Sequence, residues 1–591
     1  MRLRQPIEFL PGIVKSDTDY AQEGRYIDGD HVRFVGGDPE KWGGWRDALF
    51  GSTFPGVCRG GLRPYAASDG VDYILIAATE RVTLIDGLAQ TNITPIRATG
   101  SLSDAFSTVE GSPVVTVSHT SHGISEEYGA WVHFANGTAI GSSGITLDGA
   151  YLATVVDSNT YTVTASSDAA STETGKGSAD YEYEINIGRE DNEVGRGYGV
   201  GPYGAETYGT PRSESFITLP VTVWSTAMLG EDPIFCPRGG NIYRYDTSNG
   251  GRAVQVNNAP TADFIFVSEK GHIVALAADG DPMRIEWSDF TDVTDWSASA
   301  ADDAGGQTLF EGSRLISGMH LIGPVHLVWS DTALYRMTYT GIANEIFDIR
   351  PVSTETGIVA PHAAVRYGGR AFWLARSGFW MYDGAVSLMP RQIDIRDYVL
   401  KDINWSRIDK VCCGTIPGQQ ELIWLYPSGN SVEVDRYVSF STAGGFWMIG
   451  TLRRTAWVGD PAKRSYPLAA DPDGHLWDHE RDHDAGDEPL AFHLTTAPLE
   501  IGDGDRLMDL DALIPDTKRQ TGDVTVTIFT RDEPQGAEEQ STYTMAEGAT
   551  VIDMRENGRQ VQIRYSQEVL GGDLRLGKPR IAFKPSGRRG S

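Results

Sequence analysis

The segment Arg284–Trp296, RIEWSDFTDVTDW, is the stretch that decides the fold of this chain. Ile285 and Trp287 alternate with polar residues, which predicts a short, half-buried strand. The Asp, Ser and Thr residues that follow favour turns in which side chains hydrogen-bond to their own backbone. We therefore expect a strand that ends in a tight polar turn.

Hairpins of one type recur along the chain. Each joins an apolar strand, a polar or glycine-containing turn and an aromatic strand, as in YILIAATERVTLIDG from Tyr73 and AFWLARSGFWMYDG from Ala371. The others are IFCPRGGNIYRYD from Ile234, HLVWSDTALY from His326 and YPLAADPDGHLWDHE from Tyr466. Between Asp246 and Asp478, with RIEWSDFTDVTDW and ELIWLYPSGNSVEVDRYV counted among them, such segments return at intervals of roughly 40–55 residues, the size of a four-stranded propeller blade. A pair of stacked β-sandwiches would also space its hairpins evenly, but the repetition of one hairpin type favours a β-propeller.

Composition supports an all-β protein of several domains. The 591 residues include 68 Gly and 29 Pro, and only 22% are charged, which favours short strands and tight turns over long helices.

Acidic residues outnumber basic ones by 80 to 50, a net charge of −30, so the surface as a whole repels nucleic acid and anionic membranes. No apolar run has the length of a signal peptide or a membrane span, so neither export nor membrane insertion is expected. Free thiols are predicted for the four cysteines, Cys58, Cys236, Cys412 and Cys413.

Residues 111–187 differ in amino-acid composition from the propeller hairpins. SPVVTVSHTSHGI, GAWVHFANGTAI and GAYLATVVDSNTYTVTAS are rich in Val and Thr, which predicts an inserted small β-barrel or immunoglobulin-like domain. His119, His122 and His133 lack Cys or acidic residues at ligand spacing, so we interpret them as solvated histidines and not as zinc ligands.

The two ends of the chain carry further strand patterns. GRYIDGDHVRFVGGDPEKWGGW, Gly24–Trp45, predicts an edge hairpin that buries Trp42 and Trp45. Near the C-terminus, Val524, Val526 and Ile528, then Val561 and Ile563, alternate with polar residues as in a β-sandwich. The expected division is an N-terminal arm and hairpin (1–50), a discontinuous propeller (51–110 and 188–490), the insert (111–187) and a C-terminal β-sandwich (491–591).

Three motifs suggest chemistry, and each has a simpler explanation. His479–His483, HERDH, matches the zinc motif H-E-x-x-H, but it follows a predicted strand and precedes DAGDEP, so no helix brings the two histidines together. Gly199, Gly201 and Gly204 form G-x-G-x-x-G with Pro202 inside it and no βαβ context, which favours a connector. The acidic pairs Asp503/Asp505 and Asp509/Asp511 fail the calcium-loop pattern because Leu507 replaces an acid. We therefore assign no catalytic, cofactor-binding or metal site.

Several of these segments resemble the tail nozzle and hub proteins of short-tailed bacteriophages. The resemblance rests on RIEWSDFTDVTDW, the GGW near the start, HLWDHE, APLEIGDGDR, GRQVQIR and the terminal KPSGRR, and the insert resembles a module of phage tail proteins. Arg588 and Arg589 in that terminal segment are interpreted as an exposed tail.

The resemblance implies a structural virion protein without enzymatic activity or cofactor. It would form a ring, a homo-hexamer, below the portal and its adaptor, contact tail fibres or spikes, and belong to the virion tail assembled in the host cytoplasm. The ring would seal the genome channel and then conduct DNA without sequence-specific binding, although Arg252 or Arg336 could form a basic ring that grips it. Two alternatives stay open: a propeller glycan hydrolase, and a receptor- or glycan-binding tail module.

Overall fold

The computed structural model describes residues 3–125, 128–194, 218–299, 302–342, 345–459, 465–500, 506–533 and 536–586. The chain divides into two compact units, one of Met1–Thr53, Trp329–Arg336 and Ile349–Ser591, the other of Phe54–Val328 and Met337–Asp348. Within the described ranges the fold is all-β, with a single short α-helix, α1 (Arg396–Asp402), and 3₁₀ turns η1 (Asp19–Gln22), η2 (Ala278–Gly280), η3 (Gln392–Asp394), η4 (Trp405–Lys410) and η5 (Pro417–Gln419). None of the described helices is long and apolar enough to cross a membrane.

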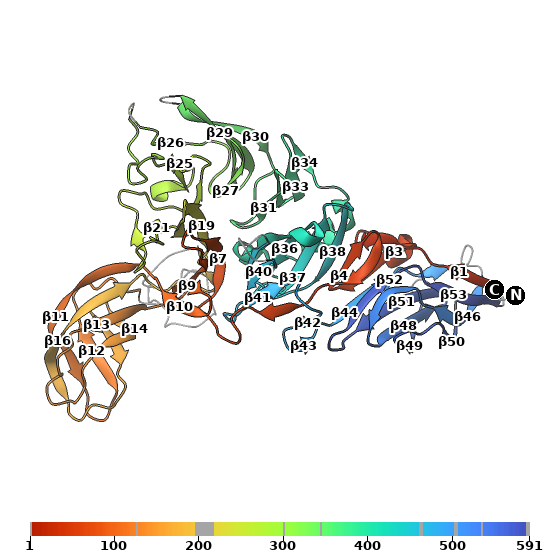
Figure 1. Cartoon of the computed structure of the whole chain (residues 1–591), viewed down its shortest axis with the longest axis horizontal. Coiled ribbons are helices and arrows are strands. Elements are labelled where there is room, and N and C mark those ends of the chain that lie inside the picture. Colours follow the sequence, from red (N-terminus) through yellow and green to blue (C-terminus); the bar gives the residue numbers. More distant parts are fainter. Residues whose placement is uncertain are drawn as a thin grey trace, which may run out of the picture. The chain divides into compact units, whose positions relative to one another are not determined.

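Groups of four consecutive strands form successive sheets, which is the blade organisation of a β-propeller (Figure 1). The first group is β7 (Cys58–Ala66), β8 (Asp72–Ala78), β9 (Val82–Asp86) and β10 (Ala89–Asn92). Then come β19 (Trp224–Leu229), β20 (Asp232–Pro237), β21 (Tyr243–Arg244) and β22 (Val254–Gln255), followed by β23 (Phe264–Val267), β24 (Ile273–Leu276), β25 (Arg284–Trp287) and β26 (Gly305–Thr308). The next sheet contains β27 (Leu315–Ile322), β28 (Val325–Ser330), β29 (Ala333–Ile342) and β30 (Glu345–Thr354).

The later blades continue the pattern, and the last one takes a strand from the N-terminal segment. Two sheets are β31 (Ala364–Tyr367) to β34 (Val386–Leu388), with β32 (Arg370–Ala375) and β33 (Gly378–Tyr382), and β35 (Cys412–Ile416) to β38 (Phe446–Thr451), with β36 (Glu421–Tyr426) and β37 (Arg436–Ser441). The last joins β39 (Ala456–Val458), β40 (Leu468–Ala470) and β41 (Leu476–His479) to β6 (Trp45–Asp47), and β42 (Asp484–Ala485) and β43 (Glu488–Pro489) extend it. Each sheet before the last is made of four strands that are consecutive in the chain, as in a propeller blade, so the alternative of stacked sandwiches does not describe this region.

The segment Arg284–Trp296 folds as its pattern predicts. β25 covers Arg284–Trp287, with Ile285 and Trp287 buried. Beyond the strand, the Asp289 carboxylate accepts hydrogen bonds from the backbone N–H groups of Thr291 and Asp292, both at 2.9 Å, and from that of Asp303 at 3.0 Å. The acidic run is thus a set of turns that satisfy backbone donors, as expected for Asx turns.

Tryptophan side chains join neighbouring blades. The indole N–H of Trp424 in β36 donates to the Ala363 carbonyl beside β31 at 3.1 Å, and that of Trp457 in β39 donates to Thr415 of β35 at 3.0 Å. Trp224 of β19 donates to Ala78 of β8 at 3.2 Å in the same manner. These three buried indoles therefore both fill the space between blades and bond one blade to the preceding one.

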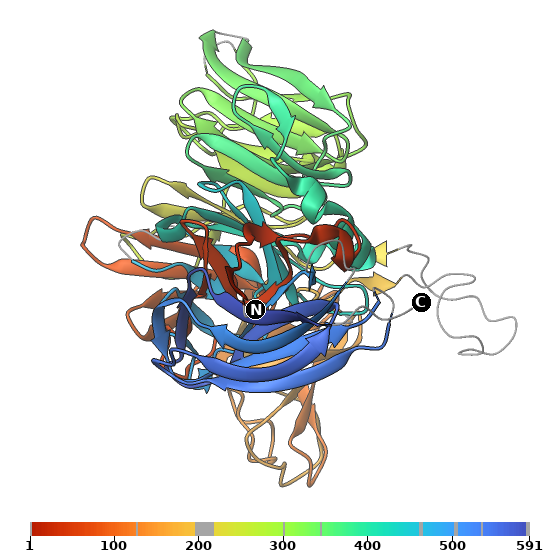
Figure 2. The same ribbon diagram turned by 90° about the vertical axis from the view of Figure 1, so that its right-hand side faces the viewer.

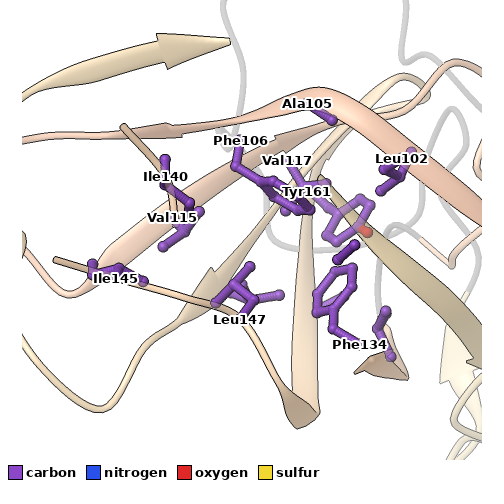
Figure 3. Close-up of a cluster of buried hydrophobic side chains, with 14 of the residues drawn as sticks. Leu102, Ala105, Phe106, Val115, Val117, Phe134, Ile140, Ile145, Leu147 and Tyr161 are labelled. Carbon is purple, nitrogen blue, oxygen red and sulfur yellow. The ribbon is translucent and has the colours of Figure 1, made fainter. Parts of the chain in front are cut away.

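The insert is a closed six-stranded barrel with strand order β11, β12, β15, β14, β13, β16. Its core contains Phe106, Val115, Phe134, Leu147 and Tyr161, all buried (Figure 3). The strands are β11 (Ile96–Thr108), β12 (Val114–Ser118), β13 (Ala130–Ala135), β14 (Gly149–Asp157), β15 (Thr160–Thr164) and β16 (Glu173–Glu184). The barrel starts before the expected boundary at residue 111, because β11 lies in residues that were assigned to the propeller. Exposed Ser, Thr and Gly residues in β11 give it little apolar alternation, so the sequence contained no clear strand signal there.

The C-terminal region is a β-sandwich that also includes the N-terminal strands. One sheet has the order β1 (Leu3–Pro6), β53 (Arg580–Ser586), β46 (Leu507–Ile514), β50 (Ile552–Gly558). Another has β2 (Leu10–Ile13), β3 (Arg25–Asp30), β44 (Phe492–Thr496), β51 (Gln560–Gln567), β48 (Val524–Arg531) and β49 (Glu539–Met545), with β45 (Leu499–Glu500) on β51. A further sheet of this region contains β4 (Val32–Val35), β5 (Asp38–Lys41), β52 (Asp573–Leu576) and β47 (Thr517–Thr521). Outside this region, β17 (Glu193–Val194) and β18 (Thr218–Leu219) form a two-stranded sheet in the other unit.

Residues 1–50 are therefore not a separate arm. β1 pairs with β53, β3 with β44, and β5 with β52, so red N-terminal strands lie beside blue C-terminal strands in Figure 2. The predicted hairpin is present as β4 and β5, and Trp42 and Trp45 are buried as expected. The sandwich strands around Val524 to Ile528 and around Val561 and Ile563 are confirmed. Pairing between the two ends is non-local, and a local pattern cannot reveal it.

Candidate functional site: the buried closure of the last blade

The motif His479–His483 does not form the arrangement that a zinc protease needs. His479 ends β41 and is 1% exposed, Glu480 and Asp482 have positive φ angles of 59° and 71°, and His483 lies at the surface near Asp573. The two histidines are therefore not on one helical face. In the described ranges, no group of three or more His, Cys, Asp or Glu could hold a metal ion.

Glu480, directly after β41, contacts a distant part of the chain. The Glu480 carboxylate accepts hydrogen bonds from Arg33 of β4 at 2.5 and 2.7 Å. Arg33 also donates to both carboxylate oxygens of Glu421 in β36, each at 3.2 Å. One guanidinium therefore joins the N-terminal hairpin, a central blade strand and the end of the last blade.

This cluster, Arg33 with Glu421 and Glu480, is deeply buried. The side chains of Arg33 and Glu421 are 1% and 3% exposed, and that of Glu480 is 14% exposed. Burial raises the pKa of Glu421 to about 7, although the charge of Arg33 opposes the shift. Burial alone would lower the pKa of Arg33, but the two carboxylates raise it well above its ordinary value. Loss of this cation would leave two carboxylates without their charge partner in a buried position, so the three chain segments depend on Arg33.

A second buried cation, Arg454, lies just before β39, the first strand of the last blade. Arg454 donates from Nε to His479 Nε2 at 2.9 Å, and its guanidinium lies 4.9 Å from the Trp45 ring and 5.2 Å from the Trp477 ring. Burial lowers the pKa of Arg454 to about 9, and burial together with the Arg454 charge lowers the pKa of His479 well below its usual value. His479 is therefore a neutral acceptor that holds Arg454 between two indoles.

The structure also contains a Ser, His and Asp arrangement that the sequence analysis missed. Ser268 Oγ lies 2.8 Å from His272 Nδ1, and His272 Nε2 lies 3.7 Å from Asp303 Oδ2. Ser268 and His272 are 6% and 0% exposed, and Ser268 Oγ also accepts the backbone N–H of His272 at 3.1 Å. Burial lowers the pKa of His272. A substrate cannot reach this hydroxyl, so the arrangement supports a turn of the blade.

The barrel histidines have internal partners. His119 Nδ1 lies 2.5 Å from the Tyr183 hydroxyl, and His133 Nε2 lies 2.6 Å from Glu184. His122 is 3% exposed and its Nδ1 accepts the backbone N–H of Ile124 at 3.0 Å, so the expectation that it is solvated is wrong.

Glu184, at the end of the barrel strand β16, is a second buried carboxylate with several charged or polar partners. Arg252 and Asn92 donate to it at 3.1 and 2.8 Å, and Arg81 lies 3.4 Å from it. Burial would raise the pKa of Glu184, but its contacts with His133, Arg81 and Arg252 hold it below the usual value. Arg252 is thus engaged at the base of the barrel, whereas Arg336 is exposed on β29.

The remaining candidates do not converge on one site. Asp509 accepts a hydrogen bond from Asn557, and Asp511 pairs with Lys584 at 3.0 Å. The four cysteines are free, and all except Cys413 are buried. Asp503 and Asp505, the glycines at 199, 201 and 204, and Arg588 and Arg589 lie outside the described residues.

Comparisons with known proteins add little beyond the fold. No family model matches, and no curated protein matches. Among solved structures, the chain is similar to Hsv2 of Kluyveromyces marxianus, with 7% identity, coverage of 49% of this chain and 91% of that one, and a TM-score of 0.28. The extracellular domain of a putative hybrid two-component system of B. thetaiotaomicron is 8% identical, and the match covers 86% of this chain and 70% of that one with a TM-score of 0.30. The endosialidase of phage phi92 is 10% identical, and the match covers 91% of this chain and 58% of that one with a TM-score of 0.14. These scores are too low to support any inference about function, so the fold assignment rests on the sheets described above.

Proposed function

We propose that this chain is a structural protein of a short-tailed bacteriophage, and that copies of it form the nozzle or hub ring of the tail below the portal and its adaptor. The proposal starts from the sequence segments that resemble that family. It assigns the protein a mechanical role, in which the ring seals the genome channel until adsorption and then conducts the DNA.

The observation that best supports a mechanical role is the closure of the chain by its own N-terminal segment. β6 completes the last blade through its pairing with β41, and β1 pairs with β53 at the other end of the chain. Arg33 adds a buried ionic contact to two distant segments. A protein that bears pressure from a packaged genome must resist being pulled open from its ends, and strands paired in this way meet that requirement.

The alternative of a glycan hydrolase requires two carboxyl groups on either side of a cleft. The acidic pair Asp509 and Asp511 lies on one strand, and each residue has a different partner. In the arrangement that resembles a catalytic triad, Ser268 and His272 are buried, and Asp303 is partly exposed. Neither of these two arrangements favours the hydrolase.

Electron microscopy of virions tests the proposal directly. An antibody against the barrel (96–184), conjugated to gold, should label the distal part of the tail, and class averages of isolated tails should show a six-fold ring. Labelling of fibres only, or of the capsid, would contradict the nozzle assignment.

A further inference from the structure

Three cavities that share lining residues lie in the unit that contains both ends of the chain, and we refer to them together as the groove. Their volumes are about 420, 150 and 270 Å³. The first and second share Tyr398, and the second and third share Asp30 and His493. The walls come from β3, from α1, from the blade strands β36, β37 and β38 and from β44, β48 and β51 of the sandwich. Pockets of this size are typical of sites for small ligands.

The charges that line the groove are close to balance. Its lining includes four cationic side chains, Lys15, Lys401, Arg436 and Arg564, and five carboxylates, Asp28, Asp30, Asp397, Asp402 and Glu568. This near neutrality contrasts with the net charge of −30 on the whole chain. A groove that attracted an anion or a cation would show a clear excess of the opposite sign.

The central charges are also paired with each other. Lys15 Nζ donates to Asp28 Oδ1 at 2.8 Å, and His493 Nε2 lies 3.1 Å from Asp28 Oδ2. Burial would raise the pKa of Asp28, but the contacts with His493 and Lys15 hold it well below its usual value. Arg436 Nε lies 3.4 Å from Asp402 Oδ2. A charged ligand would have to break one of these pairs.

Tyr398 of α1 is the aromatic group shared by two of the cavities. Its hydroxyl oxygen accepts a hydrogen bond from Arg436 Nη1 at 2.7 Å, so its own O–H can donate to a ligand. Asp28 is 41% exposed at its side chain and Arg436 37%, so an acceptor and a donor also remain accessible. The groove thus presents an aromatic ring together with donors and acceptors that are already held in place by their partners.

We propose that this groove binds a neutral oligosaccharide. Sugar hydroxyl groups both donate and accept hydrogen bonds, so they can use the carboxylates and the guanidinium without separating the ion pairs. The apolar C–H face of a pyranose ring suits an aromatic ring, and on Tyr398 it would pack beside Lys15 Nζ, which lies 5.4 Å from the ring centroid. A peptide would need apolar pockets for side-chain anchors, and the apolar side chains among the lining residues are only Ile449, Ala491 and Phe492. The proposal does not depend on the tail assignment, because it rests on the groove alone.

Saturation-transfer NMR on the full chain tests this inference. The probes are maltotetraose, cellotetraose, mannotetraose and chitotetraose, with 3′-sialyllactose as a charged comparison. We expect saturation transfer to the ring protons of at least one neutral tetrasaccharide, and weaker transfer to 3′-sialyllactose. Absence of transfer to all four neutral probes, or preference for the charged one, would overturn the proposal.

Variants then locate the binding. Tyr398→Ala should weaken the neutral probe at least ten-fold, and Tyr398→Phe, which keeps the ring and loses the donor, should weaken it about three-fold. Tyr466→Ala removes a tyrosine that does not line the groove and should bind as the wild type does. Melting curves establish that each variant is folded. If Tyr398→Ala does not fold, the affinity of Tyr398→Phe for the neutral probe tests the site. Unchanged affinity in the folded Tyr398 variants would contradict the assignment of the site.

Discussion

Arg33 and Glu480 are 447 residues apart in the chain, yet Arg33 donates to both carboxylate oxygens of Glu480 at 2.5 and 2.7 Å. The same guanidinium binds Glu421. These contacts connect the N-terminal hairpin to two blades through one buried guanidinium.

Removal of the Arg33 charge should destabilise the protein strongly. Arg33→Met leaves Glu421 and Glu480 buried without a cation, and the expected loss in the free energy of unfolding is about 3–5 kcal/mol. Urea denaturation followed by tryptophan fluorescence measures it. As a control, Asp473→Asn breaks the pair between Arg453 and Asp473, whose side chains are 55% and 57% exposed, and should cost at most about 1 kcal/mol. Equal losses in the two variants would refute the role of Arg33.

The cluster should also make stability depend on pH. The pKa of Glu421 is about 7 in the folded protein, above the ordinary value of 4.5, so the folded state binds the Glu421 proton more tightly than the unfolded state does. The corresponding stabilisation is complete below about pH 4.5 and is lost as the pH rises through 7. Between pH 5 and 8, wild type should therefore lose stability relative to Glu421→Gln, which cannot ionise. Parallel melting curves of the two proteins check this, and a constant difference across that range would contradict it.

Gly414 should not tolerate a side chain, because Trp457 covers it. A Cβ atom at this position would clash with Trp457 Cδ1, and the indole is held by its hydrogen bond to Thr415. Gly414→Ala should therefore separate the two blades and lower the melting temperature by several degrees, a loss of about 1–3 kcal/mol. Gly418→Ala is the matched control, since a Cβ atom there would meet nothing within 4 Å, and it should melt as the wild type does. Equal melting temperatures for the two variants would contradict the close packing of Trp457 on Gly414.

The barrel should fold alone only when β11 is included. β11 pairs with both β12 and β16, so a fragment of residues 111–187 lacks the strand that closes the barrel. We expect a fragment of residues 94–187 to give a β-type circular dichroism spectrum and a cooperative melt, and the shorter fragment to give neither. Cooperative melting of the shorter fragment would show that β11 is dispensable.

The sequence predicted what local patterns determine. Alternation around Ile285 and Trp287 identified a strand, and the aromatic hairpins identified blades, because each is complete within a few residues. The pairing of β1 with β53 and of β6 with β41 escaped prediction, because partners far apart in the chain leave no periodic signal.

The candidate sites show the same limit. The strand before His479 excluded a zinc helix, but nothing adjacent to Glu480 indicated its partner in β4. Ser268 and His272 are four residues apart, which is a signal that could have been found, whereas Asp303 is distant in the sequence. The groove around Tyr398 takes residues from several strands of the blades and the sandwich and from α1, so only the folded chain reveals it.

The number of copies in the tail tests the central proposal most directly. A closed ring of identical subunits repeats one heterologous contact around its axis. Light scattering on isolated tails, combined with quantification of this chain by mass spectrometry, gives its copy number. The nozzle assignment predicts six copies per tail, and two or three copies would contradict it.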